Sequence, residues 1–140
     1  FLIRDPAQVI ASYVQKMPTI DEDAIGIRRQ AELFKEISTV TGNAPVVIDS
    51  NDVLHNPAGV LAGLCRDLQV DFYPEAMLSW PAGKRTSDGV WASHWYRNVE
   101  QSTGFGKYSA ADTPLQPAHQ ALADRMRPYY AEMAALRIRP

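Results

Sequence analysis

The sequence predicts an α/β fold, and three observations lead to this class. Two short apolar runs, residues 1–3 and 46–48, alternate with longer segments of helical periodicity in the order strand, helix, helix, strand, helix. The second run is too apolar to alternate between two faces, which is typical of a parallel sheet covered on both sides. Hydrophobic residues make up 46% and charged residues 21% of the 140 residues, a composition that suits one compact domain.

The first predicted element is the end of a buried strand, residues 1–3, followed at once by a helix. Asp5 and Pro6 are residue types favoured at a helix N-cap and at the first helical position. Apolar residues then recur at helical spacing as far as Met17, and Pro18 ends the helix. Because the chain opens inside a strand pattern, we expect further residues upstream of it.

A second helix is predicted after an acidic stretch. Residues 21–23 favour a helix start, because negative charge is stabilised near a helix N-terminus. The helical pattern runs from about Ala24 to Thr39, and Gly42 and Asn43 end it.

Two further helices are predicted after the second strand. One begins near Pro57, and the last begins near Pro117 and is kinked or interrupted at Pro128. The inward residues expected on the first of these are Val60, Leu61, Leu64 and Leu68. Those expected on the last are Leu122, Met126, Tyr129, Met133 and Leu136.

Between about residue 71 and residue 112 the periodicity is lost, and the three tryptophans gather there. A loop of this length in a compact domain is usually functional or disordered. The tryptophans favour order, because disordered segments are poor in aromatic residues. The tryptophans are Trp80, Trp91 and Trp95, and we interpret Trp91 and Trp95 mainly as anchors of the loop in a core.

The predicted elements form part of a larger domain. Only two strands are visible, and three or more are usually needed to hold a domain together. We therefore expect residues 1–140 to be a single partial domain, with its remaining strands upstream or supplied by another chain.

The bulk properties exclude several classes of protein. The formal net charge of -2 provides no basic field for nucleic acid, and no apolar run approaches the ~20 residues of a membrane span. Cys65 is the one cysteine, so no internal disulfide can form and a cytoplasmic location is expected. His55, His94 and His119 have no metal-ligand spacing, so no metal is expected.

Arg4 and Ser12 form the first candidate site. Arg4 follows the first strand, and ligands of open α/β sheets bind at the carboxyl ends of strands. Ser12 lies about two turns into the helix, so its hydroxyl and the guanidinium can converge on one anion. Arginine suits a phosphate because its planar fork donates two parallel hydrogen bonds. The alternative is that Arg4 pairs with a carboxylate and Ser12 is an ordinary helix residue.

This pattern resembles the 3′-phosphate-binding motif of sulfotransferases. The motif is a strand, an arginine, Asp or Asn, a proline, and a serine eight residues after the arginine, as in residues 1–13. In that family the arginine and serine bind the 3′-phosphate of 3′-phosphoadenosine 5′-phosphosulfate (PAPS). The resemblance implies these roles for Arg4 and Ser12. It also implies a three-layer, P-loop-NTPase-like parallel sheet fold, here with two visible strands and about four helices.

The second candidate site lies in the long loop. The family has a basic pair, a glycine, a spacer, a second glycine and a tryptophan, with a histidine three residues further on. Lys84 and Arg85 match the basic pair, Gly89 the second glycine, and Trp91 and His94 the last two positions. The departure is Thr86, where the family has its first glycine. Alternatively, Lys84 and Arg85 are a solvated pair of loop cations.

The resemblance implies transfer of a sulfuryl group from PAPS to a hydroxyl or amine acceptor, without a metal. The family's phosphate-loop lysine and general base precede the Arg-Asp-Pro element, so no catalytic residue is assigned here, and the chain as given is expected to be inactive. Asp49 and Asp52 follow the second strand and can serve a ligand or a metal, but we interpret Asp52 as a helix cap.

Three functions therefore stay open. The first is a sulfotransferase, and the second is a non-catalytic nucleotide-binding or interaction module with the same fold. The third is another P-loop transferase, such as a kinase. The nature of the acceptor and the formation of a homo-oligomer are also left open by the sequence.

Overall fold

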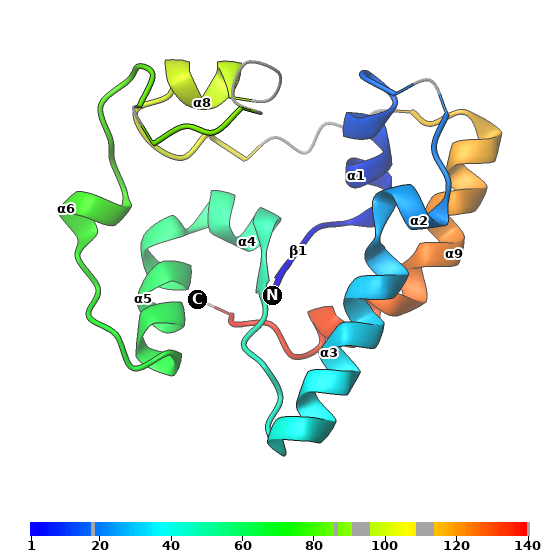
Figure 1. Ribbon diagram of the computed structural model, residues 1–140, viewed down its shortest axis with the longest axis horizontal. Coiled ribbons are helices and arrows are strands. Elements are labelled where there is room, and N and C mark those ends of the chain that lie inside the picture. The colour runs from blue at the N-terminus through cyan, green and yellow to red at the C-terminus, as the bar shows by residue number, and fades with distance from the viewer. Residues whose placement is uncertain (18, 86, 91–95, 109–113, 140) are drawn as a thin grey trace.

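The computed structural model describes residues 1–17, 19–85, 87–90, 96–108 and 114–139. Its centre is a two-stranded parallel sheet made by β1 (Leu2–Ile3) and β2 (Ile48–Asp49). In the view of Figure 1 the strands lie between helices α1, α2, α3 and α9 on one side and α4, α5 and α6 on the other. The predicted α/β class and the parallel pairing are confirmed.

The C-terminal segment also joins this sheet through its backbone, a contact that the sequence pattern did not predict. Val47 and Arg137 form a parallel bridge, and the Ile138 amide donates to the Val47 carbonyl at 2.9 Å. The second strand is therefore held by β1 on one edge and by the end of the chain on the other.

Helix α1 (Pro6–Tyr13) begins as predicted. The Asp5 carboxylate accepts from the Ala7 amide at 2.8 Å, so it is an N-cap. The helix ends at Tyr13 rather than at Met17, because the last residues form a turn in which the Met17 amide still donates to the Tyr13 carbonyl.

The predicted second helix is two helices, α2 (Glu22–Ile25) and α3 (Ile27–Thr41). Gly26 separates them, because its φ of 66° is left-handed and therefore incompatible with a continuous helix. Gly42, with a φ of 69°, ends α3 as predicted.

The predicted third helix is α5 (Pro57–Asp67), which begins at Pro57 as predicted, and an additional short helix, α4 (Ser50–His55), precedes it. Asn56 separates them, and its side chain caps α5 by accepting from the Gly59 amide at 2.9 Å. The prediction that Asp52 caps a helix is wrong. Asp49 caps α4 through the Asn51 amide at 2.7 Å, because it precedes the helix whereas Asp52 lies inside it.

Part of the long loop carries regular structure, as its tryptophans indicated. The short helices α6 (Pro74–Met77) and α8 (Arg97–Gln101) lie in it, and Ser79 and Gly104 form an antiparallel bridge. The Trp80 indole donates to the Ser102 hydroxyl at 2.9 Å. The indole ring also packs edge-on against Phe105. Trp80 is therefore an anchor of the loop, whereas Trp91 and Trp95, for which that role was predicted, lie outside the described residues.

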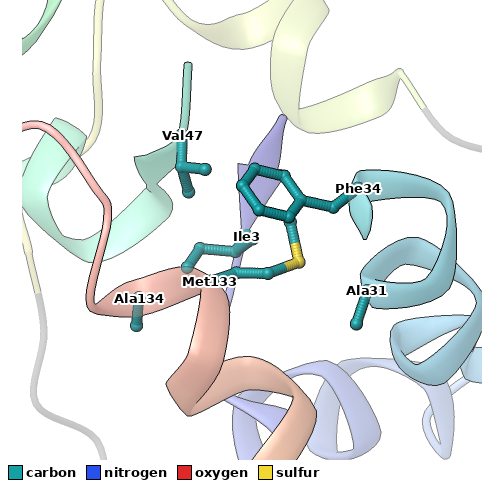
Figure 2. Close-up of a cluster of buried hydrophobic side chains, with 6 residues drawn as sticks. All are labelled: Ile3, Ala31, Phe34, Val47, Met133 and Ala134. Atoms are coloured by element: carbon teal, nitrogen blue, oxygen red, sulfur yellow. The ribbon is translucent and has the colours of Figure 1, made fainter. Parts of the chain in front are cut away.

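Helix α9 (Pro117–Ala134) crosses the molecule without interruption at Pro128. It packs against α1 and α3, and Figure 2 shows its Met133 meeting Ile3, Phe34 and Val47. Leu122, Met126 and Met133 are buried as predicted, but Leu136 and Leu68 are exposed because both lie beyond the ends of their helices.

The described residues form eight helices, where about four were expected. The surplus comes from the one helix divided at Gly26, from the additional helix α4, and from the two short helices in the loop. In this described part of the chain, no helix has the length and apolar character needed to cross a membrane.

Candidate functional site

Arg4 lies at the carboxyl end of β1 and is exposed. Its Nε donates to Gln8 Oε1 at 3.2 Å, one helical turn further along the chain. Within the described residues it pairs with no carboxylate, so the alternative of a buried ion pair is absent there. The guanidinium therefore remains available for an anion.

Ser12 is exposed on α1, two turns beyond the helix start. The neighbouring Asp5 does not compete with an anion ligand for Arg4, because one of its oxygens caps α1 and the other lies 3.5 Å from Arg127. Arg4 precedes α1 and Ser12 lies near the other end of that helix, and no hydrogen bond between these two described side chains is recorded.

A cavity of about 440 Å³ opens beside Arg4. Aliphatic side chains dominate its wall, and four polar side chains join them. The polar residues are Arg4, Gln30, Ser50 and Tyr130. A mainly apolar cavity with a few convergent polar groups is the usual form of a small-molecule site.

Lys84 and Arg85 are exposed in the loop that follows α6. Their backbone is held in place: the Arg85 amide donates to the Asp88 carboxylate at 2.9 Å, and the Gly83 amide donates to the Glu100 carbonyl at 2.7 Å. In Figure 1 the segment with α8 and helix α1 lie at the same end of the view. The structure records no contact that joins the two cations to Arg4.

The long loop is attached to the sheet side of the molecule through aromatic stacking. The rings of Tyr108 and His55 have centroids 3.8 Å apart with an interplanar angle of 32°. Because His55 ends α4, this contact joins the loop to the helix that follows β2.

Gly89 is exposed, and a Cβ added there would meet no atom within 4 Å. Within the described residues, Gly89 is therefore not needed to avoid a clash between its own side-chain position and neighbouring atoms. Thr86, Trp91, His94 and Trp95, which completed the second motif, lie outside the described residues.

The match to a family model decides the membership of this chain. A model described as a sulfotransferase domain matches residues 1–137. This chain belongs to the sulfotransferase family. No solved structure matches it significantly.

Two curated plant proteins are similar to this sulfotransferase-family chain, both from Arabidopsis thaliana. One, branched-chain-amino-acid aminotransferase-like protein 1, is 33% identical over 129 residues, which cover 92% of this chain and 23% of that protein. The other, branched-chain-amino-acid aminotransferase-like protein 2, is 29% identical over 129 residues, covering 92% of this chain and 22% of that protein. The chain spans less than a quarter of the length of these relatives.

Behind the cavity of this sulfotransferase domain lies a buried carboxylate that sequence analysis did not pair. Asp49 is 2% exposed, and it accepts a hydrogen bond of 2.6 Å from the Tyr130 hydroxyl. Burial, followed by this hydrogen bond and the negative charge of Asp49, raises the pKa of Tyr130 well above its ordinary value. Tyr130 therefore keeps its proton and serves as a donor that fixes the end of β2.

Arg137 makes a second link between the C-terminal segment and α4. Its Nε donates to Asp52 at 2.7 Å, and its Nη1 donates to the Ala134 carbonyl at 2.7 Å. The hydrogen bond to Asp52 raises the pKa of Arg137, although burial partly opposes this. Asp49 and Asp52 thus hold the fold together, and among the described residues no cluster suited to a metal ion is present.

Sequence reasoning missed two residues of this site, Ser50 and Tyr130. The available signal for Ser50 was its position directly after an apolar strand, since such positions lie where ligands bind. No comparable signal marks Tyr130, because its partner Asp49 is 81 positions away in the sequence.

Proposed function

We propose that this domain takes part in sulfuryl transfer from PAPS and binds the 3′-phosphate of that nucleotide. The observation that carries the proposal is the position of Arg4, which is exposed at the carboxyl end of β1 with no carboxylate partner among the described residues. The family membership supports the donor, because sulfotransferases take their sulfuryl group from PAPS.

In the proposed reaction, a hydroxyl or amine of the acceptor attacks the sulfur of PAPS. The bond between sulfur and the 5′-phosphate oxygen breaks, and the sulfuryl group moves to the acceptor. The acceptor proton passes to a base, and adenosine 3′,5′-bisphosphate leaves. Such a displacement depends mainly on positioning and on electrostatic stabilisation. The contacts that hold the nucleotide in place therefore affect the reaction rate directly.

The charge of the ligand explains why several cations are proposed. A phosphate monoester carries close to two negative charges at neutral pH. Arg4 supplies one positive charge, and Ser12 supplies a hydroxyl donor. We propose that Lys84 and Arg85, with the backbone at Gly89, complete the site from the long loop when nucleotide is bound.

The same proposal includes the wider architecture. A two-stranded parallel sheet with Arg4 at its carboxyl end is compatible with a P-loop-type sheet that contains more strands. In that arrangement the phosphate loop acts on the 5′ end of the nucleotide, while this domain binds the 3′ end.

Calorimetric titration of the Arg4→Ala variant of the full-length protein tests the proposal. The variant should lose about 2–4 kcal/mol of affinity for adenosine 3′,5′-bisphosphate, because a charge-assisted pair to a dianion is removed. Affinity for adenosine 5′-monophosphate, which lacks the 3′-phosphate, should remain within about twofold of wild type.

The matched control is Arg66→Ala, which removes an exposed arginine of α5 whose partner is the adjacent Asp67. This control should bind both nucleotides like the wild type. If Arg4→Ala weakened both nucleotides equally, the assignment of Arg4 to the 3′-phosphate would be wrong.

A further inference from the structure

The Ser50 hydroxyl is buried without a hydrogen-bond partner. Among the described residues that are not exposed, its Oγ is the one buried side-chain nitrogen or oxygen in this state. Buried polar groups in proteins are nearly always bonded, and an unbonded buried hydroxyl destabilises the fold. Ser50 is one of the residues that line the cavity beside Arg4, so a group bound there is a candidate partner for this hydroxyl once the short side chain turns toward it.

Ser50 and Arg4 follow the two paired strands directly. Leu2 pairs with Ile48 and Ile3 pairs with Asp49, so Arg4 comes immediately after β1, and Ser50, the first residue of α4, comes immediately after β2. Both residues also line the cavity of about 440 Å³.

The other polar side chains of this cavity already make hydrogen bonds. The Gln30 amide donates to a backbone carbonyl at 2.9 Å, and the Tyr130 hydroxyl donates to Asp49 at 2.6 Å. Arg4 uses only its Nε, for Gln8. Within the described part of the chain, the donors with no recorded partner that can face a polar ligand are the Ser50 hydroxyl, the terminal nitrogens of Arg4 and the second N–H of the Gln30 amide.

We propose that the Ser50 hydroxyl donates a hydrogen bond to the phosphate that Arg4 binds. The inference rests on the proposed function and adds a ligand from the start of α4 to those at the end of β1 and on α1. A hydroxyl donor suits a phosphate oxygen, and the aliphatic wall of the cavity strengthens the bond by excluding water.

The Ser50→Ala variant tests the inference through two measurements, nucleotide affinity and the thermal stability of the nucleotide-free protein. Its affinity for adenosine 3′,5′-bisphosphate should fall about tenfold or more, because a hydrogen bond to a charged group is lost. The thermal stability of the protein without nucleotide should not fall, because the lost hydroxyl had no partner in the fold. A hydroxyl with a structural role would give the reverse result.

Ser38→Ala is the matched control. The Ser38 hydroxyl donates to the Phe34 carbonyl at 2.7 Å inside α3, so its loss removes an occupied hydroxyl away from the cavity. The control should bind the bisphosphate like the wild type.

The outcomes separate this inference from the proposed function. If Arg4→Ala lost affinity for the bisphosphate and Ser50→Ala kept it, the Ser50 inference would be overturned and the proposed function would stand. If the wild type bound the bisphosphate no more tightly than adenosine 5′-monophosphate, the proposed function would fail and the Ser50 inference with it.

Discussion

At the scale of single residues, the pair of Tyr130 and Asp49 is the most consequential contact outside the candidate site. The Asp49 carboxylate is buried, and its two oxygens accept from the Tyr130 hydroxyl and from the Asn51 amide. A buried carboxylate that loses one hydrogen-bond donor destabilises the folded state, because that lost bond no longer compensates for its removal from water. The pair therefore connects the stability of the whole domain to one hydroxyl on α9.

The Tyr130→Phe variant should be less stable than the wild type by about 1–3 kcal/mol at neutral pH, because the hydroxyl that serves Asp49 is removed. Urea denaturation measures the difference in the free energy of unfolding. Tyr129→Phe is a suitable control, since no hydrogen bond is recorded for that hydroxyl in the described part of the chain. Equal stability of wild type and Tyr130→Phe would show that Asp49 does not depend on this donor.

The pH dependence of this effect has a definite sign. The pKa of Tyr130 is raised by folding, so the unfolded chain loses the proton first, near the ordinary value of 10.0. The contribution of the hydroxyl is fully present below pH 10.0 and declines as the pH rises above it. The stability difference between wild type and Tyr130→Phe should therefore shrink in alkaline urea titrations, whereas a constant difference would contradict the raised pKa.

At the scale of elements, several junctions predicted from local chemistry agree with the structure, although the predicted cap at Asp52 does not. Asp5 with Pro6 starts α1, and Gly42 ends α3, because these residues act on their own neighbours. The division at Gly26 was missed, because the helical periodicity continues across it. Local sequence could not predict the bridge from Arg137 to Val47, since a contact between distant segments depends on the tertiary fold.

The close packing of α5 against the C-terminal segment leads to a prediction about Gly63. A Cβ at this position would lie 2.9 Å from Ile138 Cγ2, which is too close for two carbon atoms. Gly63→Ala should therefore destabilise the domain by about 1–3 kcal/mol in thermal melts. Helix propensity alone predicts the opposite, a gain of about 1 kcal/mol.

The Ile138→Leu background provides the control for Gly63→Ala. Leucine lacks the Cγ2 methyl group of isoleucine, so the added Cβ has room and the cost of Gly63→Ala should be smaller in that background. If Gly63→Ala raised the melting temperature in the otherwise wild-type protein, the packing of the C-terminal segment on α5 would be incorrect.

At the scale of the whole molecule, the sequence could place Arg4 at a strand end, because its strand, cap and helix are adjacent in sequence. Its role toward a ligand remains a prediction. Ser50 and Tyr130 could not be added, because their place in the same cavity depends on the pairing of β1 with β2 and on the packing of α9. The cations Lys84 and Arg85 lie in a segment whose approach to Arg4 remains a prediction.

The most direct test of the account is a calorimetric titration of the full-length wild-type protein with two nucleotides that differ only in the 3′-phosphate. Adenosine 3′,5′-bisphosphate should bind about 30-fold or more tightly than adenosine 5′-monophosphate, which corresponds to about 2 kcal/mol from the 3′-phosphate contacts. Equal affinities for the two nucleotides would contradict the central claim, because a site at Arg4 that ignores the 3′-phosphate is not a donor-nucleotide site of the kind proposed.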